Sequence, residues 1–218
     1  KGLSFVVLPD DVDLDPACTI LVCMQLRDLI LSEENRMRFQ VGDMVIHPGY
    51  GAGLVAKIEH LASLGSNKLY YLIELSDESK TNVWVPVKDA EAKGVRHPTP
   101  KSQLGRIWRI LRAVPETPAT DHKEWHELLQ EKLDGGDIFR IAEVVRDLYW
   151  KEHRVRRLTI TGTELYNKGF MLLTSEVAVM QGCELAAAKA AIVGILGASL
   201  AAEPALSLTS RFDIPDQM

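Results

Sequence analysis

The architecture of this chain follows first from residues 39–53, which read Phe39-Gln-Val-Gly-Asp-Met-Val-Ile-His-Pro-Gly-Tyr-Gly-Ala-Gly53. An apolar run interrupted by Pro-Gly and Gly-x-Gly is typical of two strands joined by a tight turn. Four runs are rich in Val, Ile, Leu and aromatic residues: 43–47, 53–61, 68–75 and 81–87. Four short strands in so short a segment predict a small antiparallel sheet or barrel of the SH3 or Tudor size. Such a module has little room for a deep catalytic pocket, and its strand edges favour docking.

The spacing of apolar residues becomes helical after His97-Pro98-Thr99-Pro100. In the first helical run Arg106, Arg109 and Arg112 occupy the faces beside the apolar stripe. Further helices are predicted to open at an Asp121-x-x-Glu124 capping box, at Asp137 and at a Thr161-x-x-Glu164 capping box. Gly135-Gly136 is expected to end the first of these, and an Ala-rich segment after Cys183 is expected to be helical too. The predicted class is therefore α+β, with a Tudor/SH3-like antiparallel β module followed by an all-helical C-terminal domain.

The amino-acid composition limits the classes of protein to which this chain can belong. The chain has 218 residues, 46% of them hydrophobic and 25% charged, which is ordinary for a soluble globular protein. Three cysteines without a CxxC pair indicate a reducing compartment rather than a disulfide scaffold. The apolar stretch 185–202 contains Lys189 and Ser199 and is a weak match to a membrane span. We expect a cytoplasmic monomer without a membrane partner.

Motifs that would indicate an enzyme or a metal protein are incomplete. The glycines of residues 49–53 lack the Gly-Lys-Ser/Thr that opens a phosphate-loop helix, so we read them as a tight turn. His122 and His126 have the i, i+4 spacing of zinc proteases, but Lys123 stands where those enzymes have their general base. The sequence therefore predicts a protein without catalytic residues, cofactor or bound metal.

One part of this acidic chain is net basic. Residues 101–160 hold 12 basic and 10 acidic side chains, whereas the whole chain has a formal net charge of −5. The densest basic cluster consists of Lys151, Arg154, Arg156 and Arg157. Cations at a helix end also favour the helix dipole, so a solvated helix end and a nucleic-acid surface are both open readings.

Several motifs together resemble the CarD/CdnL family. They are Phe39-x-Val41-Gly42-Asp43-x-Val45-x-x-Pro48-x-x-Gly51-x-Gly53, Ile58-Glu59, Val83-x-Val85-Pro86, Gly94-Val95-Arg96, Ala142-Glu143-Val144-Val145-Arg146-Asp147-Leu148 and Leu172-Leu173-x-Ser175-Glu176. The resemblance covers roughly residues 37–182. It implies a non-enzymatic bacterial transcription regulator whose Tudor-like module docks on the RNA polymerase β subunit. The helical domain would contact promoter DNA at the upstream edge of the bubble and favour the open complex, largely without reading base sequence.

The resemblance also implies site residues, with departures. The family's tryptophan wedge at the start of the second helix falls on His122, and Trp125 follows three residues later, so Trp125 is either a displaced wedge or a packed side chain. The remaining residues expected to contact DNA are the basic ones at the end of the net-basic stretch: Arg146, Lys151, Arg154, Arg156 and Arg157. Leu61 and Trp84 stand where some members have docking arginines, and the expected polymerase-binding set is His60, Leu61, Trp84 and Val85.

The domain organisation expected from the sequence has four parts. Residues 1–36 are an extension outside the resemblance, 37–98 the polymerase-interacting domain, 101–200 the helical DNA-contacting domain and 201–218 a tail. The extension is native, an over-extended start or part of something longer, and a chain beginning at Met37 is expected to fold and bind polymerase. The alternative function is a protein adaptor on RNA polymerase without productive DNA contact.

Overall fold

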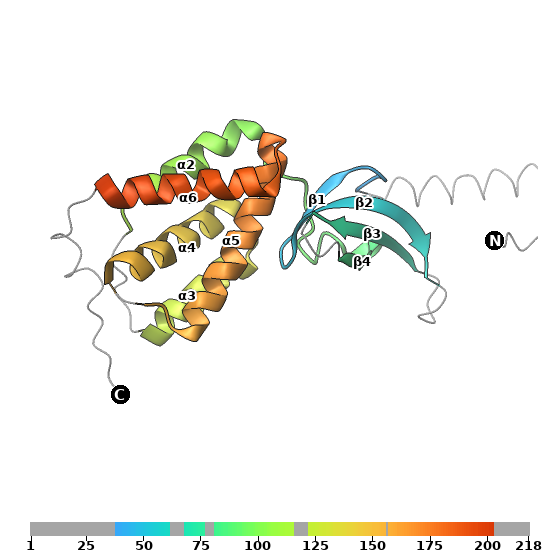
Figure 1. The fold of residues 1–218 in the computed structure, drawn as a ribbon. Coiled ribbons are helices and arrows are strands. Elements are labelled where there is room, and N and C mark those ends of the chain that lie inside the picture. The colour runs from blue at the N-terminus through green and yellow to red at the C-terminus, as the bar shows by residue number, and fades with distance from the viewer. Residues whose placement is uncertain (1–37, 62–67, 77–80, 116–121, 156, 203–218) are drawn as a thin grey trace, which may run out of the picture. The chain divides into compact units, whose positions relative to one another are not determined.

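The computed structural model describes residues 38–61, 68–76, 81–115, 122–155 and 157–202 (Figure 1). The chain divides into two units, Lys1–Arg38 and Phe39–Met218, and every element below belongs to the second. The predictions made for residues 1–36 lie outside the described residues, as does the predicted tail 201–218 except for residues 201–202, which end α6.

The β module is a single antiparallel sheet with the strand order β1-β2-β3-β4. Its strands are β1 (Met44–His47), β2 (Gly51–His60), β3 (Leu69–Leu75) and β4 (Asn82–Pro86). The runs of branched and aromatic side chains thus form the predicted strands, because such residues pack well on a pleated surface. The register of β2 with β3 shifts between Val55 and Lys57. An irregularity of this kind bends the strand and increases the twist of the sheet.

The core of the sheet lies on one of its faces. Phe39, Tyr71 and Val85 are almost completely buried there, beside Val45, Val55 and Ile73. The rings of Phe39 and Tyr71 meet edge to face with centroids 5.6 Å apart. The Tyr71 hydroxyl accepts a hydrogen bond from the Phe39 backbone N–H at 3.3 Å, so the one polar group of this ring is satisfied.

The helical region follows the sheet in the chain (Figure 1). It contains α2 (Leu104–Arg112), α3 (His122–Asp134), α4 (Ile138–Trp150), α5 (Ile160–Gln181) and α6 (Leu185–Ala202), with a five-residue π-helix, η4 (Lys151–Val155), directly after α4. Short 3₁₀ turns at Val87–Asp89 and Lys101–Gln103 precede α2. The α+β class, a small antiparallel sheet followed by helices, is confirmed.

Local signals account for most helix boundaries. α3 ends before Gly135-Gly136, and Gly136 has a φ of 66°, which is the left-handed region that glycine adopts without strain. The Asp137 carboxylate then accepts from the Phe139 backbone N–H at 2.9 Å and caps α4 as predicted. The capping box expected at Thr161 is wrong by two residues, because Thr159 is the N-cap of α5 and accepts from the Gly162 N–H at 3.1 Å.

The apolar helix α6 packs on α2 and α5. Its mean hydropathy of 1.9 over 18 residues meets the length and composition of a membrane span. Ala188, Ile192 and Leu196 nevertheless face the helical core, in which α5 contributes the long buried run from Leu172 to Ala178. One such helix is weak support for membrane insertion, and 22% of its residues are buried, among them the three that face the core.

Candidate functional site

The face of the sheet opposite its core carries an exposed tryptophan. Leu72 pairs with both Lys57 and Trp84, and Tyr70 pairs with Glu59 and Pro86. Because side chains alternate between the two faces, these two rows lie on the side away from Tyr71 and Val85. We call Lys57, Glu59, Tyr70, Leu72 and Trp84 the outer face. Trp84 is 38% exposed there, on β4, which is an edge strand of the sheet.

The four residues expected to bind polymerase do not share one surface. The side chain of Val85 is in the sheet core, so only its backbone is open to a partner. His60 pairs with Leu69 one row beyond Glu59, on the face opposite Trp84. Leu61 is half-buried directly after β2 and continues the alternation on the side of Trp84. Trp84 and Leu61 are thus on one face by alternation, and this face also carries the half-buried Tyr70 and the buried Leu72, which sequence reasoning did not single out as site residues.

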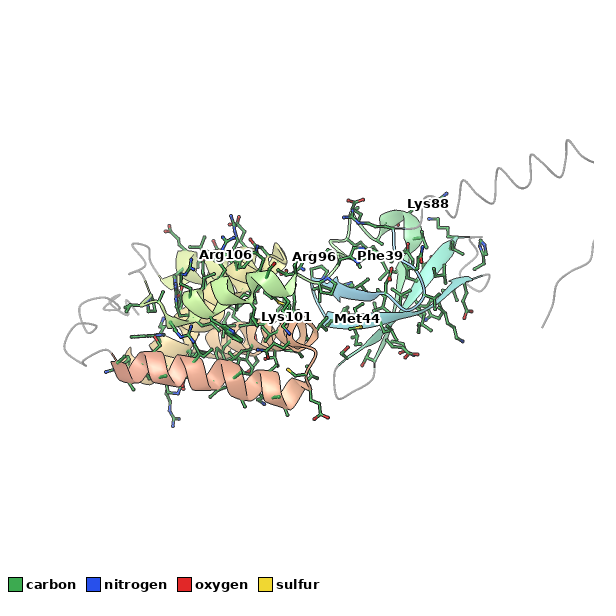
Figure 2. The ribbon with its side chains drawn as sticks, turned by 90° about the horizontal axis from the view of Figure 1, so that it is seen from above. Phe39, Met44, Lys88, Arg96, Lys101 and Arg106 are labelled. Atoms are coloured by element: carbon green, nitrogen blue, oxygen red, sulfur yellow. The ribbon has the colours of Figure 1, made fainter. Side chains whose placement is uncertain are left out.

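A buried carboxylate joins the segment after the sheet to α5. Arg96 Nη1 and Nη2 donate to the two carboxylate oxygens of Glu176, each at 2.7 Å. The Thr99 backbone N–H and hydroxyl donate to Oε1 of the same carboxylate at 3.0 and 2.7 Å. Arg96 also donates to the Gly136 carbonyl at 2.9 Å. Figure 2 marks Arg96 on the stretch that leads from the sheet to α2.

A second contact with α5 comes from β2, and it explains why residue 51 is a glycine. The Ala52 N–H donates to the Ser175 hydroxyl at 3.2 Å, and that hydroxyl donates to the Leu172 carbonyl at 2.9 Å. Gly51 has a φ of 82°, and a Cβ at this residue would lie 2.3 Å from the Ser175 oxygen. The expected turn glycine thus also permits the close approach of β2 to α5.

Two of the four residues of the basic cluster, Lys151 and Arg154, make internal contacts. Lys151 is only 9% exposed, and its Nζ lies 4.1 Å from the centroid of the Trp125 ring. Arg154 donates to the Leu200 carbonyl of α6. Arg157 is exposed, and Arg156 lies outside the described residues. The π-helix that carries Lys151 and Arg154 is a rare element, often found at functional sites.

Trp125 is packed rather than presented to solvent. Its side chain is 3% exposed within the core of the helical region, and Lys151 covers its ring. The structure therefore corresponds to the packed alternative, and this indole is not open to a base step. His122, the other wedge candidate, is the first residue of α3.

Arg146 is paired within its own helix. Its Nε and Nη2 contact Asp147 Oδ1 at 2.8 and 2.7 Å, and its Nη1 donates to the Ile110 carbonyl at 3.4 Å. Burial raises the pKa of Asp147, while the adjacent guanidinium opposes that shift. Arg146 therefore joins α4 to α2 and is not positioned for an external phosphate.

A depression of about 620 Å³ lies between β1 and the α5–α6 corner. Its lining includes Met44, Ser175, Cys183, Glu184 and Leu185. Among the described residues that line it, Cys183 and Glu184 are the only titratable side chains. This lining does not bring together a nucleophile, a base and an oxyanion donor.

Comparison with known proteins agrees with the order of the two parts. Residues 39–98 match the family described as the CarD-like/TRCF RID domain, and residues 106–193 match the CarD C-terminal domain, together about two thirds of the chain. YdeB of Bacillus subtilis (strain 168), a proposed transcription factor, is 28% identical over 144 residues, which are 66% of this chain and 93% of that protein.

A Tudor-like sheet followed by this set of helices defines a class of transcription regulators that interact with RNA polymerase. The chain belongs to the CarD/CdnL family within that class.

Proposed function

We propose that this protein docks on the RNA polymerase β subunit through the outer face of its sheet. There it contacts promoter DNA with its helical region and stabilises the open complex at the upstream edge of the bubble. The match of both parts to one family of polymerase-interacting regulators supports the general function. We place it in the cytoplasm, with the polymerase, as a monomer without a catalytic role.

The single observation that carries the docking proposal is the exposure of Trp84. An exposed tryptophan on an edge strand, with the buried Leu72 paired directly to it and the half-buried Tyr70 in the next row, has the composition of an interface centre. Lys57 and Glu59 lie on the same face and supply charged groups at its rim. The free edge of β4 additionally offers backbone groups for strand addition.

The proposed DNA contact is electrostatic rather than base-specific. A helical region that binds phosphates would bind duplex DNA weakly and with strong salt dependence. A wedge formed by Trp125 is not part of this proposal, because that side chain is buried. The burial of Trp125 and the pairing of Arg146 are the observations that favour the second candidate, an adaptor on the polymerase without productive DNA contact.

The docking proposal is tested by pulling down purified β subunit with the full chain. Trp84→Arg should abolish most of the capture and leave the thermal midpoint nearly unchanged, because the side chain is partly exposed. The matched control is Val193→Arg, which changes a side chain on α6 that is 41% exposed. If Trp84→Arg captures the β subunit as well as Val193→Arg does, the outer face is not the docking surface.

A further inference from the structure

The outward face of α2 carries a set of exposed positive charges that has no ion pair within the described residues. Arg106, Arg109 and Arg112 are exposed on this helix, and Lys101 is exposed in the 3₁₀ turn that leads into it. Residues 101–112 contain no acidic side chain. Lys101 and Arg106 are marked in Figure 2, beyond Arg96 along the chain. We call these four residues the α2 basic face.

The cations of this face differ from those near residue 151 in what they contact. Within the described residues, Lys101, Arg109 and Arg112 have neither an ion pair nor a side-chain hydrogen bond. The Arg106 guanidinium lies 3.9 Å from the centroid of the Phe139 ring. Arg146, Lys151 and Arg154, by contrast, are held by Asp147, the Trp125 ring and the Leu200 carbonyl. The sequence cannot separate these two sets, because both appear simply as basic residues.

Helix electrostatics do not explain the arrangement. Arg109 and Arg112 lie in the last turn of α2, where cations stabilise the negative end of the dipole. Lys101 and Arg106 lie at the opposite end, where the first turn has no acid and cations are unfavourable. A row of cations that extends over both ends of the helix is better explained by an anionic partner.

The chemistry of the face favours phosphates over a protein surface. The exposed residues from 101 to 113 are charged, polar or small, and the large exposed apolar side chains of the described structure all lie elsewhere. Protein interfaces usually have an apolar centre, which this face does not offer. Guanidinium groups bind phosphate oxygens with two parallel hydrogen bonds.

We propose that the α2 basic face binds the phosphates of one strand of duplex DNA. This inference rests on the proposed function and assigns its DNA contact to α2 instead of to residues 146–157. With a rise of about 1.5 Å per residue, Arg106 and Arg112 are about 9 Å apart along the helix axis. Phosphates of one strand recur about every 3.4 Å along the duplex, so this length accommodates two or three of them.

The test is fluorescence anisotropy of a labelled 30-base-pair duplex with the full chain over a series of salt concentrations. Arg109→Gln/Arg112→Gln should lower the slope of log affinity against log salt by up to about 1.8, since each phosphate contact contributes about 0.9. At 0.1 M salt the same coefficient corresponds to a loss of affinity of up to about 60-fold. The control, Lys68→Gln/Lys88→Gln, removes the same charge from exposed positions of the β module and should lower the slope much less.

The possible outcomes separate this inference from the proposed function. If the wild-type protein binds DNA and the arginine variant keeps its slope and affinity, α2 is not the contact and this inference is overturned alone. If the wild-type protein does not bind DNA at all, the proposed DNA contact fails together with it. If the arginine variant binds DNA normally and loses capture of polymerase, the face binds an acidic protein surface instead. Circular dichroism of each variant should show wild-type helix content.

Discussion

Replacing Glu176 by glutamine removes the charge at the centre of the Arg96–Glu176 contact. The carboxylate is 1% exposed and accepts two hydrogen bonds from Arg96 and two from Thr99, whereas Arg96 is 29% exposed. Glutamine keeps one acceptor oxygen but turns an NH₂ group towards a donor. At least one donor of the cluster therefore loses its acceptor in the variant.

The magnitude follows from these contacts. Breaking a buried ion pair costs about 3–5 kcal/mol, and a hydrogen bond to a charged group contributes about 1.5–3 kcal/mol. Because Arg96 reaches solvent and can be hydrated in the variant, we expect the lower end, about 3 kcal/mol. For a chain of this size that corresponds to a fall of about 6–12 °C in Tm.

The assay is thermal unfolding followed by circular dichroism, with urea unfolding as a second measure. The control is Lys168→Gln, which breaks a contact of similar length, 2.9 Å, between side chains that are 34% and 58% exposed. That exposed pair should contribute less than about 1 kcal/mol. A Glu176→Gln protein that melts within 2 °C of the wild type, like the control, would refute the reasoning from burial.

Three further predictions follow from individual contacts. Gly51→Ala should lower Tm, because the new Cβ would clash with Ser175 and the backbone φ is positive; Ser175→Gly in the same chain should recover part of the loss. Burial, and secondarily the charge of Lys93, lowers the pKa of His47. The unfolded chain therefore binds a proton more readily than the folded chain, and the free energy of unfolding should fall as pH drops below about 6.5. His47→Gln should reduce this pH dependence of the urea unfolding free energy between pH 7 and pH 5. Trp125→Ala should lower the free energy of unfolding by about 3–5 kcal/mol and leave the salt slope of DNA binding unchanged. A stable variant with an altered preference for forked DNA would instead support a wedge role for Trp125.

The elements were predictable because their signals are local. Strand runs, the Gly135-Gly136 stop and the Asp137 cap act through residues close in sequence, and each lies where the sequence predicts it. The cap of α5 was misplaced because Thr159 and Thr161 both offer a hydroxyl before the same helix. Sequence pattern does not decide which of two such hydroxyls reaches a backbone N–H.

The candidate sites were less predictable because their environment is set by distant residues. Arg96 and Glu176 are 80 residues apart, and Arg154 contacts a carbonyl 46 residues away. A run of basic residues therefore does not show which charges are already satisfied. Trp125 illustrates the same point, since the burial of a helix face depends on which helices pack against it.

The lifetime of open promoter complexes after addition of a competitor tests the central claim most directly. With polymerase and the full chain, we expect a longer lifetime than with polymerase alone. Trp84→Arg should lose this effect through docking and Arg109→Gln/Arg112→Gln through DNA contact, while Val193→Arg should retain it. An unchanged lifetime with the wild-type protein, or a Trp84→Arg protein that stabilises open complexes as well as wild type, would contradict the account.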